Sequence, residues 1–285
     1  MVSGLTFTEL IKGKLPELAV AMPMYRSRHT AWLSFESLCK QEDVNFPWEL
    51  IVVEEWEPNM FGLGRILEYA DRLEAAGCCR ISYQSLSSWI PLCQKWVRLA
   101  KLAQESSKFF LLQSADDFYP PKRLFRAMEA MSLDSDSVQW FSDYRCLLYN
   151  LNLDKVAIFE DSKALEGLSS GTCIATLTDI VKRLPIEDKR ISVDTWLFQH
   201  VKNFTGKDFT VAVNGHDDWL HGFFLQGLNN ISDGQQCFQG GVQGIQVAST
   251  GELGGCPPDI VSRVRNLRPL AQSWTLRPWR NRRSG

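Results

Sequence analysis

The sequence predicts an α/β fold in which a mostly parallel β-sheet is flanked by helices on both faces. The main evidence is the alternation of short apolar segments with amphipathic segments, because parallel strands need long crossover connections, usually helices. Two of the apolar segments end in paired acidic residues, Glu54-Glu55 and Asp116-Asp117. Since the carboxyl ends of parallel strands meet at one edge of a sheet, we expect ligands to bind there.

The N-terminal part of the chain contains the first predicted strand, helix and strand. Residues 18–22 and 49–53 are short apolar runs, and each is followed by turn-forming or acidic residues. Between them, residues 30–41 carry apolar side chains at helical spacing, and Thr30 is a candidate N-cap. This pattern indicates a βαβ unit.

The next segments lead to the second acidic pair. A weaker strand is predicted at residues 80–83, and a helix at residues 91–105 has Pro91 in its first turn. The apolar run that begins at Phe109 then ends at Asp116-Asp117. Two interpretations of this pair stay open: it holds a divalent cation at a strand end, or Asp117 caps the helix that follows. The surrounding pattern favours the cation.

The second half of the chain is predicted to continue the same alternation. Residues 167–184 suggest a glycine-containing turn, a short strand and a helix. Asp194 then stands at the start of another predicted helix, and residues 209–213 read as an alternating strand. His216 and His221 follow that strand, and a single histidine is more often a hydrogen-bonded structural residue than a ligand.

Composition is consistent with a soluble cytoplasmic protein of one domain. The chain has 285 residues, of which 45% are hydrophobic, and this is enough for one large core or two modest ones. No run of eighteen apolar residues appears and residues 1–14 lack a signal-peptide pattern, so we expect no transmembrane segment and no export. The eight cysteines show no Cys-x-x-Cys spacing, which favours reduced, buried thiols.

The C-terminal segment differs from the rest in composition. Residues 240–255 are rich in glycine, which predicts a loop or a mobile flap. Residues 263–285 contain seven arginines and no acidic residue, whereas the first 262 residues carry 24 basic and 33 acidic side chains. Arg277, Trp279 and Arg280 could therefore bind a polyanion. The alternative, that these arginines pair with the acidic body of the protein, stays equally open.

Taken together, these segments resemble the GT-A fold of nucleotide-sugar glycosyltransferases, specifically the family 2 type, over residues 16–235. Met22-Pro23-Met24-Tyr25-Arg26 is similar to the opening strand and turn of that family, and Val52-Val53-Glu54-Glu55 to its second strand. Residues 114–120 resemble its Asp-x-Asp metal motif with the trailing proline. Ser114 departs from the motif, because it stands where the first aspartate would be and a neutral hydroxyl is a weaker ligand.

The resemblance implies a nucleotide-sugar pocket and a metal site. The residues implied to bind the nucleotide sugar are Pro23, Tyr25, Arg26, Glu54, Glu55, Arg98, Ser114, Ala115 and Asp116. Mn²⁺ or Mg²⁺ is implied to bind Asp116 and Asp117, with His221, or alternatively His216, closing over the metal and the diphosphate. These cations favour oxygen ligands, which the two carboxylates provide.

The resemblance also implies that Asp194 is the catalytic base that deprotonates the acceptor. Val193 stands where the family often has a glutamate, so only half of that small motif is present. A role for Asp194 as a helix cap stays open beside the catalytic one.

These implications together predict a GT-A glycosyltransferase, inverting and of the hexosyltransferase type, with a UDP-sugar as the expected donor. The expected halves of the GT-A domain are residues 1–130 for the nucleotide sugar and residues 131–235 for the acceptor, followed by the flap and basic tail at 236–285. The acceptor could be DNA carrying hydroxymethylated bases, or a lipid-linked or surface glycan. A catalytically degenerate binding module and a nucleotidyltransferase are the alternatives from other classes.

Overall fold

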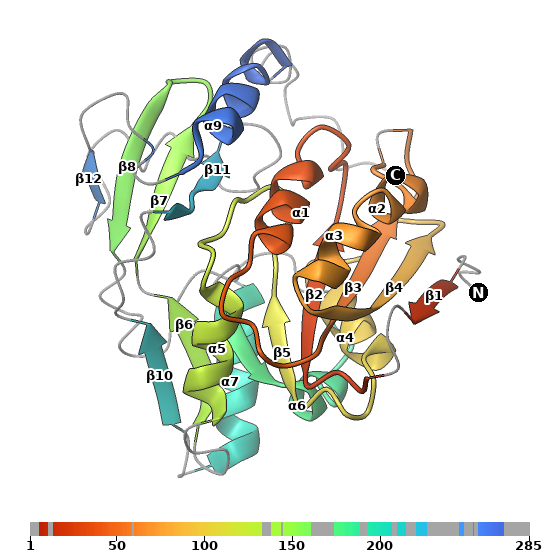
Figure 1. The fold of residues 1–285 in the computed structure, drawn as a ribbon. Coiled ribbons are helices and arrows are strands. Elements are labelled where there is room, and N and C mark those ends of the chain that lie inside the picture. Colours follow the sequence, from red (N-terminus) through yellow and green to blue (C-terminus); the bar gives the residue numbers. More distant parts are fainter. Residues whose placement is uncertain are drawn as a thin grey trace.

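The computed structural model describes most of the chain and places two β-sheets beside each other (Figure 1). The described residues are 6–10, 14–58, 60–132, 138–143, 145–160, 174–188, 193–206, 210–214, 221–226, 245–247, 253 and 256–270. A large sheet with helices on both faces forms the body, and a smaller sheet lies at one end of it.

The large sheet has eight strands in the order β1-β4-β3-β2-β5-β9-β6-β10. The strands are β1 (Thr6–Leu10), β2 (Leu18–Met24), β3 (Trp48–Glu55), β4 (Cys78–Leu86), β5 (Phe109–Leu112), β6 (Val138–Asp143), β9 (Ile174–Leu177) and β10 (Thr210–Asn214). Only β1 and β9 run antiparallel to their neighbours. The predicted mostly parallel α/β sheet is therefore confirmed.

Helices cover both faces of this sheet, which explains why β2 and β3 are buried along almost their whole length. One apolar core joins the sheet to α1 (Ala31–Cys39), α2 (Leu63–Leu67), α3 (Ala70–Ala75) and α5 (Arg123–Ser132). A second core on the opposite face joins it to α4 (Leu92–Leu102), α6 (Thr178–Lys182) and α7 (Val193–Thr205). Each predicted strand and helix of the N-terminal half lies within a few residues of an observed element.

The smaller sheet was not predicted. It contains β7 (Arg145–Asn150), β8 (Lys155–Glu160), β11 (Phe224–Gln226) and β12 (Ile245–Val247), in the order β11-β7-β8-β12. Helix α9 (Pro258–Arg265) packs on it through a third core that includes Phe118, Phe223 and Ile260. Strand β12 corrects the prediction that residues 240–255 form only a loop, because residues 245–247 pair with β8.

Some predicted features fall outside the described residues, namely His216 and the three tail residues Arg277, Trp279 and Arg280. Within the described part of the chain, no helix is both long and apolar enough to span a membrane.

Candidate active site

The candidate site lies at the edge of the large sheet formed by the carboxyl ends of its parallel strands, which we call the carboxyl edge. Strand β2 lies between β3 and β5, and the chain passes outward from β2 to β3 and β4 on one side before it returns to β5 on the other. Ligands of open α/β sheets bind where the strand order reverses in this way. Here that point brings together the turn after β2 and the acidic turn after β5.

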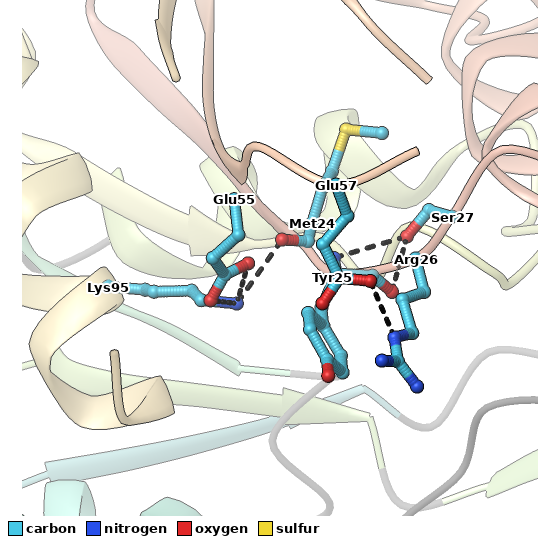
Figure 2. Close-up of polar contacts among 7 residues, drawn as sticks. All are labelled: Met24, Tyr25, Arg26, Ser27, Glu55, Glu57 and Lys95. Atoms are coloured by element: carbon cyan, nitrogen blue, oxygen red, sulfur yellow. Dashed lines mark hydrogen bonds and ion pairs between the residues drawn. The ribbon is translucent and has the colours of Figure 1, made fainter. Parts of the chain in front are cut away.

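The turn after β2 presents Tyr25 and Arg26 (Figure 2). Arg26 has a backbone φ of 54°, a left-handed conformation that is uncommon for a residue with a side chain. Its Nε donates to Glu57 Oε2 at 2.7 Å, and its guanidinium lies 5.1 Å from the centroid of the Tyr25 ring. The Ser27 hydroxyl donates to the Tyr25 carbonyl at 3.2 Å, which tightens the turn. The turn thus holds a partly exposed cation at the switch point.

Beneath this turn, Glu55 and Lys95 form a buried ion pair. Lys95 Nζ donates to Glu55 Oε2 at 2.6 Å and to the Met24 carbonyl at 3.2 Å, and it lies 5.3 Å from the Tyr25 ring centroid. Burial raises the pKa of Glu55, whereas the Lys95 charge opposes that rise. Burial also lowers the pKa of Lys95, and the Glu55 carboxylate opposes that shift. The pair therefore joins β3, α4 and the turn after β2.

Lys95 was missed from the sequence, where Arg98 was expected to face the nucleotide. Lys95 stands in the first turn of α4, which begins close to the end of β4 and therefore at the carboxyl edge. Arg98 is three residues further along the same helix and is partly buried. A helix rises about 1.5 Å per residue, so Arg98 starts nearly one turn further from that edge. Its role as a nucleotide contact stays a prediction.

Glu54 is fully buried and binds the protein's own backbone. Its carboxylate accepts hydrogen bonds from the Phe61 and Gly62 amides at 2.6 and 3.0 Å, and from the Tyr83 hydroxyl at 3.2 Å. Burial raises its pKa, and these three donors oppose the rise. Glu54 therefore anchors the segment before α2, and its predicted contact with a nucleotide stays a prediction.

The acidic turn after β5 carries Ser114, Ala115, Asp116 and Asp117. The Ser114 hydroxyl donates to Asp116 Oδ1 at 2.5 Å, so the residue at the variant motif position bonds to the next acid of the motif. Asp117 is buried, and its Oδ1 accepts the amide hydrogen of Leu225 at 2.9 Å. Asp117 therefore does not cap α5, which begins only at Arg123, and this excludes the helix-cap interpretation.

Arg123 supports the acidic turn from below. This buried guanidinium donates to the Gln113 side-chain oxygen and, at 2.6 Å, to the Leu112 carbonyl. It also lies 3.9 Å from the centroid of the Tyr119 ring, and the Tyr119 hydroxyl accepts the Ser114 amide hydrogen at 2.8 Å. The end of β5 and the start of the turn are thus held by one connected network.

The two aspartates place like charges beside each other, with Asp117 buried and Asp116 partly exposed. Burial raises the pKa of Asp116, and burial together with the Asp116 charge raises the pKa of Asp117 well above its usual value. A bound cation would relieve both effects, and carboxylate oxygens are the ligands that Mg²⁺ and Mn²⁺ favour. Among the described residues no group of three or more His, Cys, Asp or Glu side chains could hold a metal. The two carboxylates can supply only part of a coordination shell, so a hard cation held here would take its other ligands from water or a phosphate.

Segment 221–226 reaches the acidic turn from the smaller sheet. Phe118 and Phe223 exchange two backbone hydrogen bonds of 2.9 and 2.6 Å. Gly222 lies so close to this turn that an added Cβ would stand 2.6 Å from Pro120 Cδ and 2.7 Å from the Phe118 carbonyl oxygen, so only glycine fits. His221, which is exposed, precedes this contact, so the structure brings its backbone beside the acidic turn. Metal binding by His221 stays a prediction.

Asp194 lies in the first turn of α7, as predicted, and α7 starts at the carboxyl edge. This helix ends shortly before β10, whose first residue pairs with the first residue of β6, so α7 must run back from the carboxyl edge. Glu187 joins the starts of α4 and α7: its carbonyl accepts from Gln94 Nε2 at 3.0 Å, and its carboxylate from Trp196 Nε1 at 2.9 Å. Asp194 is therefore at the same edge, on the α4 face of the sheet.

The described arginines of the basic C-terminal segment pair with acids on the body of the protein. Arg263 lies 3.6 Å from Glu36 and 3.8 Å from the Trp32 ring centroid. Arg265 and Arg268 lie 3.8 and 3.3 Å from the Asp154 carboxylate. These contacts agree with the interpretation in which the arginines pair with the acidic body.

Comparison with known proteins gives structural but not sequence matches. No protein-family model and no curated protein matches this sequence. TarS from S. aureus is similar in structure, with a TM-score of 0.53, 15% identity and coverage of 74% of this chain and 37% of TarS. TarS 1-349 in complex with UDP-GlcNAc gives a TM-score of 0.55 and 15% identity, covering 75% of this chain and 60% of that one. This chain thus spans less than two thirds of either TarS chain.

A mannosyltransferase from Pyrobaculum calidifontis, solved in complex with GDP-Man and Mn²⁺, is similar over more of its length. The TM-score is 0.55 at 13% identity, and the match covers 92% of this chain and 73% of the mannosyltransferase. These neighbours are GT-A glycosyltransferases. With its mostly parallel sheet and its acidic turn at the switch point, the chain has the GT-A fold of the nucleotide-sugar glycosyltransferases, as its sequence motifs predicted.

Proposed function

We propose that this protein is a glycosyltransferase that transfers a sugar from a nucleotide-diphosphate donor to an acceptor hydroxyl. The observation that carries the proposal is the meeting of three groups at one edge of a GT-A sheet: the Asp116-Asp117 turn, the Arg26 turn above the Glu55–Lys95 pair, and Asp194 at the start of α7. Two structural neighbours solved with UDP-GlcNAc and with GDP-Man and Mn²⁺ support a nucleotide-sugar donor.

In this proposal each of the three groups has a separate role. Asp116 and Asp117 would hold Mn²⁺ or Mg²⁺, which when bound supplies positive charge against the departing diphosphate. Arg26 and Tyr25 would bind the nucleotide, and the Glu55–Lys95 pair would keep their turn in place. Asp194 would accept the proton of the attacking hydroxyl, from the side of the sugar opposite the diphosphate, which gives inversion at the anomeric carbon.

The proposal also covers the identity of the donor and the class of the acceptor. A UDP-sugar is the first donor to test, because a neighbour carries UDP-GlcNAc. The described arginines of the C-terminal segment bond to Glu36 and Asp154, so they add no support for DNA as the acceptor. A glycan acceptor, lipid-linked or on a surface, is therefore the acceptor class to test first.

The first experiment is thermal stabilisation of the protein by a panel of nucleotide sugars with and without Mn²⁺. A ligand that binds only the folded state raises the melting temperature, so a metal-dependent rise with one sugar names the donor without knowledge of the acceptor. If no nucleotide sugar and no nucleotide stabilises the protein under either condition, the proposal is wrong and a degenerate binding module becomes the better description.

A second experiment tests Asp194. Asp194→Asn is expected to lower sugar transfer, or hydrolysis of the donor when the acceptor is unknown, by about 10²- to 10⁴-fold, the usual contribution of a general base. Donor affinity, measured by calorimetry, should stay close to that of the wild type. Loss of donor binding in Asp194→Asn would contradict its assignment as the base and indicate a structural role for this carboxylate.

A further inference from the structure

Trp56 is an exposed aromatic side chain at the carboxyl edge. Its side chain is 65% exposed, more than that of any other aromatic residue that the structure describes; Phe204 is 53% and Trp89 46% exposed. Its backbone is nevertheless fixed, because it directly follows β3 and its amide donates to the Leu86 carbonyl at the end of β4 at 2.7 Å. The indole is thus presented to solvent from a rigid position.

The topology of the sheet indicates which part of a bound donor would reach Trp56. The phosphates belong at the switch point between β2 and β5, where Arg26 and the acidic turn meet. The sugar must approach Asp194, and α7 packs against β6, on the β9 and β6 side of β5. The nucleoside therefore extends the other way, over the end of β3. Strands are about 4.8 Å apart, so that end lies about two spacings from β5, a span comparable to an extended nucleoside diphosphate.

Tyr25 is the other aromatic side chain at this edge, and its surroundings differ. Its ring is partly buried and lies within 5.1 Å of the Arg26 guanidinium and 5.3 Å of Lys95 Nζ, so cations already surround it (Figure 2). An aromatic ring that is occupied in this way offers less of its face to a ligand. Trp56, by contrast, offers a large indole surface, and stacking of a base on an aromatic side chain contributes about 1–3 kcal/mol.

We infer that Trp56 is the stacking platform for the nucleobase of the donor. The inference rests on the proposed function and adds to it a residue that recognises the nucleoside rather than the phosphates. Stacking tolerates any base, because every base has an aromatic face. Trp56 thus selects nucleotides against other diphosphates, and the choice among bases is left to hydrogen-bonding groups.

The test is calorimetric titration of UDP and of inorganic diphosphate, each with Mn²⁺, into the full-length protein and its variants. Trp56→Ala should weaken UDP binding by about 5- to 100-fold and leave diphosphate binding unchanged. Trp56→Phe should keep most of the UDP affinity, because it retains a ring. Phe204→Ala is the matched control: Phe204 is an exposed aromatic residue beside Arg183 near the end of α7, away from the edge, and UDP affinity should not change.

Three outcomes would overturn the inference. If UDP affinity is unchanged in Trp56→Ala, Trp56 does not stack on the base. If Trp56→Ala weakens UDP and diphosphate binding equally, Trp56 stabilises the structure of the carboxyl edge and does not recognise the base. A loss of UDP binding in Trp89→Ala but not in Trp56→Ala moves the platform to the loop after β4. If the wild-type protein binds UDP in any of these cases, the proposed function is retained and only the role of Trp56 is rejected. If the wild-type protein binds neither UDP nor diphosphate, the proposed function falls and the inference with it.

Discussion

Two pairs of charges at the carboxyl edge, one fully buried and one with a partly exposed member, differ in how their charge is compensated. Glu55 and Lys95 are opposite charges, and they satisfy each other at 2.6 Å inside the protein. Asp116 and Asp117 are like charges, and their hydrogen bonds come from the neutral Ser114 hydroxyl and Leu225 amide. The Arg123 charge lowers the pKa of Asp117 only weakly, compared with the rise that burial and the Asp116 charge cause. The charges of the first pair thus compensate each other, whereas the second pair would be stabilised by an added cation.

The difference has a consequence for how each part of the site works. A self-compensated pair such as Glu55–Lys95 can hold a turn in place whether or not a ligand is bound. A pair of like charges with a buried member is costly without a ligand and favourable with a cation, so in the proposed function it would link metal binding to the order of the edge. In the proposed function, the site would combine a preformed turn for the nucleotide with a turn that responds to metal.

The largest effect is expected when the complete pair is broken. Lys95→Met leaves Glu55 buried without its partner, so the free energy of unfolding should fall by about 3–5 kcal/mol, measured by urea denaturation. The double variant Glu55→Gln/Lys95→Met should recover most of that loss. Lys101→Met, in the same helix but exposed, is the control and should change little. An equal loss in both single lysine variants would contradict a special role for the buried pair.

A smaller effect of opposite sign is expected at the acidic turn. Asp117→Asn keeps an oxygen acceptor for the Leu225 amide but removes the buried charge, so the metal-free protein should become more stable by about 1–2 kcal/mol. The rise in melting temperature on adding Mn²⁺ and donor should be lost at the same time. Destabilisation of the metal-free variant would show that the charge of Asp117 is compensated within the protein.

The sign of the pH dependence follows from the raised pKa of Asp117. A carboxyl whose pKa is higher in the folded than in the unfolded protein favours folding at low pH, and that contribution is lost as pH rises from its unfolded pKa through its raised folded pKa. The stability advantage of Asp117→Asn over the wild type should therefore grow as pH rises through that window, in urea unfolding without metal. Glu105→Gln, at an exposed acid, should show no such growth.

The smallest effect is expected at the partly exposed pair of Arg26 and Glu57. Their side chains are 27% and 23% exposed, so water screens the charges, and Glu57→Gln should lower the free energy of unfolding by less than about 1 kcal/mol. The loss should shrink at high ionic strength, because salt weakens such pairs. A loss as large as that of Lys95→Met would show that the two pairs are not separated by burial as proposed.

The local pattern of the sequence was sufficient for most strands of the large sheet and for several site positions. An apolar run that ends in Asp116-Asp117 predicts a buried strand followed by acids, and the structure has β5 and the acidic turn there. The start of α7 at Val193 also followed from local signals, which places Asp194 in a first helical turn. These predictions succeeded because burial on both faces of a parallel strand forces an apolar run, and helix starts have their own residue preferences.

Local pattern was insufficient where the partner comes from a distant part of the chain. The position of Lys95 at the carboxyl edge depends on where α4 begins relative to the sheet, and the sequence around Lys95 does not show this. Adjacent Glu54 and Glu55 point to opposite faces of β3, so one bonds to Phe61 and Gly62 and the other to Lys95. The smaller sheet was missed only partly for this reason. Strands β11 and β12 come from distant segments, but β7 and β8 form a local hairpin that the sequence analysis did not identify.

The sequence by itself therefore determined the α/β class, the alternation of strands and helices in the N-terminal half, and the acidic residues at strand ends, because each depends on burial and on neighbours within a few residues. The tertiary structure decided which charges are compensated and which are not, because that depends on partners brought together by the fold. Leu225 on Asp117 and Lys95 on Glu55 are such partners, separated by 108 and 40 residues along the chain. The free energy of a buried charge is set by those contacts, and no local pattern encodes them.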